Sequence, residues 1–233
     1  MQKRQRKVSL FPLCCCLLIA TQGIVNSVMA SLDWLDESKI TRALSARYGE
    51  RAGMRSTAWF KVLHANQMSS EADKLAAVNG FFNLFRFVDD SKLWGDSNYW
   101  ATPLEFIGAN GGDCEDFAIA KFFSLLQLGI PEEKMRITMV KATSVNQYHM
   151  VLTYYETPGS IPLVLDNLDP QIKLATKRKD LLPVYSFNGK QLWLNKEKGQ
   201  GKLAGSASKL EKWNNLRQRL NVNNLKKPKL SLE

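Results

Sequence analysis

The chain has 233 residues, of which 45% are hydrophobic and 23% charged, and this composition predicts one soluble globular domain with a sizeable core. Its formal net charge of +10 would suit a nucleic acid or an anionic membrane surface as partner. However, the sequence contains no recognisable RNA- or DNA-binding motif, which argues against a nucleic-acid-binding protein.

Residues 1–30 have the pattern of a secretory signal peptide. A basic start precedes a mostly apolar run over residues 11–25, and Val28-Met29-Ala30 resembles a cleavage site. A lipid-anchored alternative is weaker, because Phe11-Pro12-Leu13 lacks the small residues expected before a lipidated cysteine. We therefore expect export, with no stable membrane insertion after signal removal and with nucleic acid excluded as a partner. Since residues 1–30 carry four basic and no acidic side chains, the mature chain has a net charge near +6.

Helices are expected in the first half of the mature chain. Apolar residues at near-helical spacing predict helices over residues 32–51, 58–68 and 71–88, the last with a phenylalanine-rich face for the core. Residues 89–110 are predicted to be irregular. Their aromatic side chains individually suit the edge of the core, but together they suggest one wall of a substrate groove.

The stretch Asn110-Gly111-Gly112-Asp113-Cys114-Glu115-Asp116 predicts a tight turn followed by the start of a helix. Asp113 suits the cap position, and Glu115 and Asp116 suit the first turn, where carboxylates complement the positive helix end. Cys114 is thereby placed at a helix N-terminus, where exposed backbone N–H groups favour the reactive thiolate. The neighbouring carboxylates act in the opposite direction, so an activated Cys114 needs a nearby cation.

The second half of the chain is predicted to be mainly strands. Apolar segments separated by turn signals predict strands at residues 135–142, 148–155, 161–165, 182–187 and 191–194. Asn188-Gly189 predicts a hairpin between the last two. Helices followed by antiparallel strands indicate an α+β domain over residues 31–200, with the helices packed on one face of the sheet. The basic residues 201–233 are expected to form a solvated helix with a frayed end.

Cys114 is the only cysteine that remains after residue 30, so an intramolecular disulfide is impossible. The usual alternative for a lone cysteine is an inert, buried side chain that behaves as a small hydrophobe. An unpaired thiol is a liability in an oxidising compartment, and together with the helix-start position this favours a functional role for Cys114.

Cys114, His149 and Asp166 are predicted to converge at one end of the sheet. His149 lies in a strand and Asp166 ends the following strand, so antiparallel pairing of the two would bring them within hydrogen-bonding reach. The helix that begins at Cys114 is expected to pack on that sheet. His149 as an imidazolium would stabilise the thiolate and later protonate a leaving amine, while Asp166 would orient the ring.

Each of these residues also has a structural alternative. A strand histidine is most often structural, and Asp166 competes with Asp169 as a turn carboxylate, whereas His64 is expected at the surface. The order of cysteine, histidine and aspartate on a helix start and two strands is more specific than any single member. Backbone N–H groups around Cys114 would stabilise an oxyanion, with the Trp100 indole as a candidate donor.

Three stretches resemble the bacterial transglutaminase-like cysteine proteinases, the LapG-type periplasmic proteases. They are Gly112-Asp113-Cys114-Glu115-Asp116, Tyr148-His149-Met150-Val151-Leu152 and Leu165-Asp166-Asn167, and the resemblance covers roughly residues 35–195. It implies a papain-like α+β fold, a periplasmic location and proteolysis of a large, repeat-containing surface adhesin. Cleavage at a di-alanine in the adhesin's N-terminal retention region would release it and so control biofilm attachment. The resemblance also implies calcium and an inhibitory inner-membrane cyclic-di-GMP receptor of the LapD type.

Calcium has a local basis in the sequence. Asp113, Glu115 and Asp116 offer three hard oxygen donors within four residues, which suits Ca²⁺, although the spacing is not that of an EF-hand. Bound Ca²⁺ would also neutralise the carboxylates that oppose a Cys114 thiolate. From the residues alone, an acidic helix start that serves only the helix dipole is an equal alternative, and the resemblance favours calcium.

Two other functions remain open at this point. A transglutaminase or a cell-wall peptide amidase would use the same acyl-enzyme chemistry with a different groove and acceptor. A non-catalytic binding module would have no need of Cys114, His149 and Asp166, so their presence argues against it.

Overall fold

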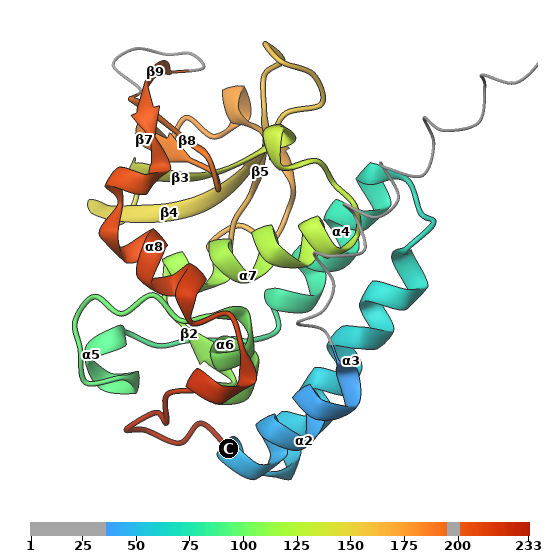
Figure 1. The fold of residues 1–233 in the computed structure, drawn as a ribbon. Helices are drawn as coiled ribbons and strands as arrows, with labels where there is room; N and C mark the ends of the chain where they lie inside the picture. The colour runs from blue at the N-terminus through green and yellow to red at the C-terminus, as the bar shows by residue number, and fades with distance from the viewer. Residues whose placement is uncertain (1–35, 195–200) are drawn as a thin grey trace, which may run out of the picture. The chain divides into compact units, whose positions relative to one another are not determined.

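The computed structural model describes residues 36–194 and 201–233, so the signal peptide predicted for residues 1–30 lies outside the described part of the chain. The described residues form an α+β arrangement of helices and a largely antiparallel sheet, which confirms the predicted fold class (Figure 1). Among them, no helix has the length and apolar character needed to cross a membrane.

Three helices open the described chain: α2 (Glu37–Tyr48), α3 (Glu50–Asn66) and α4 (Glu71–Phe82). Side-chain caps start two of them, since Asp36 accepts from Lys39 N and Ser70 accepts from Asp73 N. The predicted boundaries were wrong in three places. Gly49, with φ of 103°, separates α2 from α3 inside the single helix predicted for 32–51. The helix predicted for 58–68 begins earlier, at Glu50, and α4 ends before the predicted limit at residue 88.

Residues 83–112 contain short elements, although residues up to 88 were expected to be helical and residues 89–110 irregular. After α4, β1 (Arg86–Phe87) pairs in parallel with β2 (Gly111–Gly112), and α5 (Asp90–Leu93) and α6 (Pro103–Ala109) lie between them. α6 begins with a capping box, in which Thr102 and Glu105 satisfy each other's backbone N–H groups, and with Pro103 in its first turn. This segment is therefore ordered by caps and pairing, and it ends directly before Cys114.

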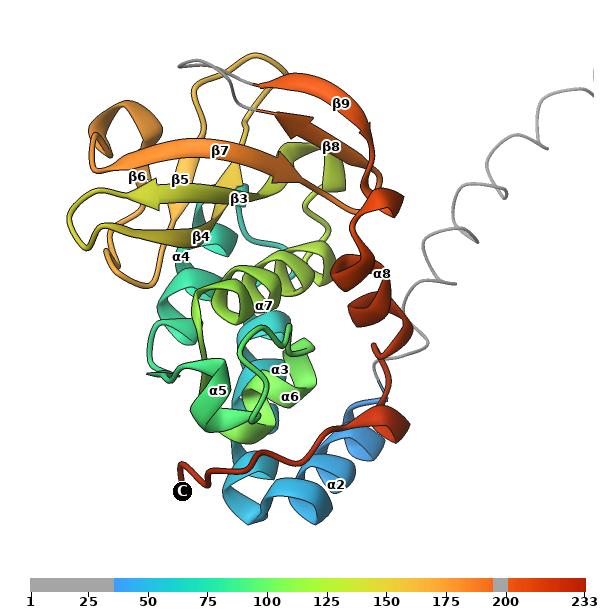
Figure 2. The same ribbon diagram turned by 90° about the vertical axis from the view of Figure 1, so that its left-hand side faces the viewer.

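The main sheet has seven strands in the order β6-β5-β4-β3-β7-β8-β9, and its neighbouring strands pair antiparallel. The strands are β3 (Met135–Ala142), β4 (Gln147–Tyr154), β5 (Leu163–Leu165), β6 (Lys173–Leu174), β7 (Leu181–Phe187), β8 (Gln191–Leu194) and β9 (Lys202–Ser206). α7 (Cys114–Gln127) packs against β4 and β3 on one side and against α4 and α6 on the other (Figure 2). Single-turn 3₁₀ helices occupy Glu132–Lys134, Ala175–Lys177, Ala207–Lys209 and Val222–Asn224.

The expectation of a solvated helix and a frayed end for residues 201–233 is wrong. β9 adds an edge strand to the sheet, and α8 (Glu211–Gln218) buries Trp213 and Leu216. The Trp213 ring packs against Phe122 and Phe123 of α7, so α8 completes the core around that helix. Further along, Leu232 is buried among residues of α5 and α6. Several basic side chains are exposed between these apolar anchors, which explains why the composition suggested a free tail: Lys209, Arg217, Lys227 and Lys229.

Candidate active site

Cys114 is the first residue of α7, as predicted, and Asp113 caps the helix. The turn before it requires small residues. A Cβ atom at Gly112 would lie 2.3 Å from Asp116 Oδ2, and one at Gly111 would lie 2.3 Å from the backbone oxygen of Arg86. The two glycines therefore allow β1 and the carboxylate of Asp116 to approach the backbone that leads into Cys114.

The surroundings of the Cys114 sulfur favour the protonated thiol. The thiol donates a hydrogen bond to Glu115 Oε2 at 3.0 Å. Burial raises the pKa of Cys114 far above its usual range, and the charges of Glu115 and Asp113 raise it further. A backbone hydrogen bond from Met150 acts in the opposite direction and also fixes the sulfur beside β4, one residue from His149.

His149 and Asp166 meet as the strand order predicted. β4 and β5 are antiparallel neighbours with Leu152 opposite Leu165, and His149 Nε2 lies 2.7 Å from Asp166 Oδ1. Both side chains are buried. Because Nε2 faces the carboxylate, Nδ1 is the ring nitrogen left for other partners. The competing turn carboxylate, Asp169, instead forms a partly buried ion pair with Lys173.

Arg178 anchors Asp166 and was not found from the sequence. Its Nη2 donates to Asp166 Oδ2 at 2.7 Å and to Asp180 Oδ2 at 2.9 Å, while the Leu168 N–H donates to Asp166 Oδ1 at 3.0 Å. Burial alone would raise the pKa of Asp166, but the hydrogen bonds from His149, Leu168 and Arg178 lower it to about 2. Asp166 is therefore held ionised and in a fixed orientation.

Four carboxylates gather at the start of α7. Asp113 and Glu115 form a possible metal-ligand group with Cys114, and Asp113 also belongs to a second group with Asp90 and Asp116. Within each group, one ligand atom per residue lies within 4.8 Å of the others. Asp90, at the start of α5, was not predicted, since no local signal in the irregular-looking segment distinguishes it from its neighbour Asp89.

The cluster is short of positive charge. Oδ1 of Asp90 and Oδ1 of Asp113 are buried with no hydrogen-bond donor facing them. Burial and mutual repulsion raise the pKa of Asp113 to about 11 and that of Asp90 to about 7, and they raise the pKa of Asp116 as well. Hard, crowded oxygen donors of this kind fit a calcium ion. The predicted ligands Asp113, Glu115 and Asp116 thus lie together, with Asp90 as a fourth member.

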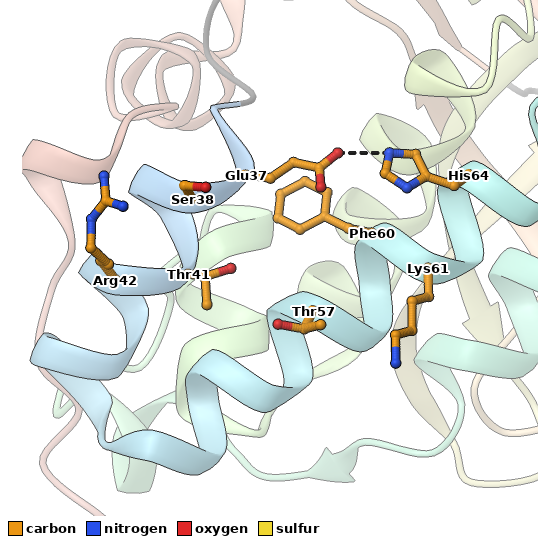
Figure 3. Close-up of a pocket in the computed structure, with 8 residues that line it drawn as sticks. All are labelled: Glu37, Ser38, Thr41, Arg42, Thr57, Phe60, Lys61 and His64. Atoms are coloured by element: carbon orange, nitrogen blue, oxygen red, sulfur yellow. Dashed lines mark ion pairs between the residues drawn. The ribbon is translucent and has the colours of Figure 1, made fainter.

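Two other residues singled out in the sequence lie in different settings. The Trp100 ring stacks on Phe187 with ring centroids 5.6 Å apart. His64 is exposed, as expected, and pairs with Glu37 at 2.7 Å beside a hollow of about 410 Å³ between α2 and α3 (Figure 3). None of the predicted catalytic residues lines that hollow.

Comparison with known proteins agrees with this geometry. The family described as bacterial transglutaminase-like cysteine proteinase matches residues 54–198. LapG of Legionella pneumophila is 40% identical over 80% of this chain and 98% of its own, with a TM-score of 0.70. Its calcium-bound form gives a TM-score of 0.70, with 100% of that chain covered, and its EGTA-treated form gives 0.71. A search of curated proteins finds no match.

The matched family region contains Cys114, His149 and Asp166 as well as the four clustered carboxylates. It also spans the sheet from β3 to β8 and the helix that presents the cysteine. The chain belongs to the bacterial transglutaminase-like cysteine proteinases, and it is a protease of the LapG type.

Proposed function

We propose that this protein is a calcium-dependent periplasmic cysteine endopeptidase in which Cys114 is the nucleophile, His149 the acid–base group and Asp166 the orienting carboxylate. The observation that carries the proposal is the 2.7 Å contact between His149 Nε2 and Asp166 Oδ1 next to a cysteine at a helix N-terminus. The contact leaves Nδ1 of His149 for the sulfur, which is the arrangement that a cysteine protease requires.

The reaction follows from these positions. His149 Nδ1 accepts the Cys114 proton, and the thiolate attacks the carbonyl carbon of the scissile peptide bond to form a tetrahedral intermediate. Collapse of the intermediate breaks the C–N bond, and His149 returns the proton to the leaving amine. Water then hydrolyses the thioester with His149 as base. Backbone N–H groups at the start of α7 are placed to stabilise the oxyanion, with the Trp100 indole as a further candidate.

Asp113, Glu115, Asp116 and Asp90 are the residues that would hold calcium. When bound, the ion supplies positive charge that offsets the carboxylates beside the thiol. Glu115 and Asp113 both raise the pKa of Cys114, so neutralising them lowers it toward the range where His149 can accept the proton. The calcium-bound and EGTA-treated forms of the Legionella protein support calcium involvement in this family.

The substrate that we propose is the N-terminal retention region of a large, repeat-containing surface adhesin, cut at a di-alanine. Its release would control biofilm attachment. The 40% identity to LapG supports this choice, as does the predicted export signal. The corresponding inhibitory partner would be an inner-membrane cyclic-di-GMP receptor of the LapD type that sequesters the enzyme.

The test is cleavage of an adhesin N-terminal fragment by the purified protein. Wild type should cut the fragment in calcium, and neither Cys114→Ala nor chelator-treated wild type should do so. A fragment with the di-alanine changed should resist cleavage. Cutting by Cys114→Ala would refute the mechanism, and cutting in chelator would refute the calcium dependence. Incorporation of an added amine without cleavage would indicate a transglutaminase instead.

A further inference from the structure

Arg219, just after α8, reaches across to the segment that precedes the candidate active site. Its Nη2 donates to the backbone oxygen of Trp100 at 2.6 Å, and its Nη1 donates to Glu105 Oε2 at 2.9 Å and to the Tyr99 hydroxyl. The guanidinium also lies over the Tyr99 ring, 4.6 Å from its centroid. One side chain thus holds a backbone carbonyl, a carboxylate and an aromatic ring at once.

Glu105 is the fully buried centre of these contacts. Its two oxygens accept from the Tyr99 hydroxyl and from the backbone N–H groups of Thr102 and Lys226, in addition to Arg219. A buried carboxylate with this many donors is fixed in place, and each donor is fixed with it. The C-terminal segment supplies two of the four, Arg219 and the Lys226 backbone.

The segment that Arg219 contacts also donates hydrogen bonds to the carboxylate cluster. The backbone N–H of Tyr99 donates to Asp90 Oδ2 at 2.6 Å, and that of Ala101 donates to Asp116 Oδ1 at 2.7 Å. Trp100, whose carbonyl Arg219 binds, lies between these two amides in the chain. A shift of this tripeptide would therefore move Asp90 and Asp116 relative to Asp113 and Glu115.

The rest of the C-terminal segment secures the other flank of the same region. The Lys229 N–H donates to the Leu93 oxygen at 2.7 Å, and Leu232 packs with Leu93, Trp94 and Ala101. Residues 93–101 are consequently held on both sides by residues 219–233.

We propose that Arg219 is a positioning residue for the divalent-cation site, acting through Tyr99 and Trp100 on Asp90 and Asp116. The inference rests on the proposed function, because it takes the carboxylate cluster to bind calcium. The family match ends at residue 198, so Arg219 lies outside it. The C-terminal segment is on this view a structural part of the catalytic machinery.

A purely electrostatic role and a positioning role of Arg219 predict opposite changes in calcium affinity when the residue is replaced. If the residue acted only as a positive charge near the cluster, replacing it with a neutral side chain would strengthen cation binding. If it positions the ligands, the same change weakens binding. Arg217, exposed on α8, donates to the Gly189 oxygen at 3.3 Å and offers a control that removes an equal charge.

The experiment is calorimetric titration of calcium into the full-length protein after removal of bound metal, at a temperature well below unfolding for every variant. Arg219→Met should weaken calcium binding by about tenfold or more, as expected for loss of a residue that orients metal ligands. Arg219→Lys keeps the charge but has one ammonium in place of the forked donors, so it should also bind calcium more weakly than wild type. Arg217→Met should match wild type.

An affinity for Arg219→Met that equals or exceeds that of wild type would overturn the inference and leave the proposed function intact. Wild type that binds no calcium would overturn the inference together with the calcium part of the proposed function. If Arg219→Met does not fold, Tyr99→Phe serves in its place, since it removes the hydroxyl between Arg219 and Glu105 and keeps the ring. Unchanged calcium affinity in Tyr99→Phe would then overturn the inference.

Discussion

Asp166 and Cys114 lie in opposite electrostatic settings, although both take part in the proposed reaction. Asp166 accepts hydrogen bonds from His149, Leu168 and Arg178, which keep it ionised despite burial. Cys114 instead is buried and faces Glu115 and Asp113, and burial together with these two charges raises its pKa and favours the protonated thiol. His149 lies between a carboxylate that is always charged and a thiol whose charge depends on its neighbours. Control of activity is therefore concentrated at the thiol.

Replacing Asp166 with asparagine tests the orienting role. Asp166→Asn should lower kcat by about 10²–10⁴-fold, because an amide cannot stabilise the imidazolium and can select the wrong ring tautomer. Asp169→Asn is the matched control, since Asp169 is three residues away and pairs with Lys173 of β6 and with the Gln171 N–H rather than with His149. Peptidase assays on both variants decide the matter. Equal losses in the two would contradict the assignment.

Site residues that carry a local sequence signal could be predicted from the sequence alone. Cys114 follows a Gly-Gly-Asp turn, and His149 and Asp166 lie at corresponding ends of consecutive strands, so pairing rules bring the latter two together. Arg178 and Asp90 could not be found in this way. Arg178 lies in a polar loop and Asp90 begins the short helix α5, and the role of each depends on which distant residue the folded chain brings next to it.

At the level of elements, α7 connects the nucleophile to the rest of the site. Two turns after Cys114, the buried Lys121 donates to Asn83 Oδ1 at 2.8 Å, and Asn83 Nδ2 donates to the backbone oxygen of Asp166 at 2.9 Å. Asn83 caps the C-terminus of α4, and Asn79 within that helix donates to the Pro170 oxygen. The loop that carries Asp166 is thus attached to both helices.

Lys121 gives a pH-dependent contribution to stability. Burial lowers its pKa to about 7, although the charge of Asp166 acts the other way. The unfolded chain therefore binds more protons than the folded chain between pH 7 and the ordinary lysine pKa of about 10.4, and stability rises with pH in this window.

Lys121→Met should remove this dependence. The free energy of unfolding of the variant minus that of wild type should be larger at about pH 7 than at about pH 9.5, by an amount on the order of a few kcal/mol. Urea unfolding at the two pH values measures it, with the exposed Lys61→Met on α3 as control. A difference between variant and wild type that does not change with pH would contradict the buried, ionisable role of Lys121.

The element predictions failed where tertiary contacts override local patterns. The helix predicted for 71–88 ends early because Arg86 and Phe87 pair with the glycines before Cys114. α6 carries a local signal within the segment expected to be irregular, because Thr102-Pro103 is followed by Glu105 three residues after the threonine. Strands β3, β4, β5, β7 and β8 were predicted because their apolar runs and turn residues agree, whereas the edge strands β6 and β9 were not predicted.

At the scale of the whole molecule, the proposed calcium site makes stability depend on both pH and calcium. Burial raises the pKa of Asp90 to about 7, so the folded protein holds a proton that the unfolded chain releases above about pH 4. Without calcium, the contribution of Asp90 to the free energy of unfolding must therefore fall as pH rises from about 4 to 7. Calcium requires the ionised carboxylates, so its stabilising effect should grow over the same range.

Thermal unfolding with and without calcium checks this linkage. We expect the calcium-induced rise in Tm to be several degrees larger at about pH 8 than at about pH 5.5. Metal-free protein at both pH values gives the baseline, and magnesium at the same ionic strength controls for screening. A calcium effect that is independent of pH, or larger at the lower pH, would mean that the cluster does not exchange protons for the ion.

Alkylation of Cys114 by iodoacetamide across pH, in calcium, tests the central claim most directly, because it reports thiolate formation at the proposed nucleophile. Wild type should react well below pH 8.5, the pKa of an ordinary thiol. His149→Ala and calcium-free wild type should both react only at higher pH, since one lacks the imidazole and the other keeps the opposing carboxylate charges. An ordinary thiol profile for wild type in calcium, or an identical profile for His149→Ala, would contradict the account.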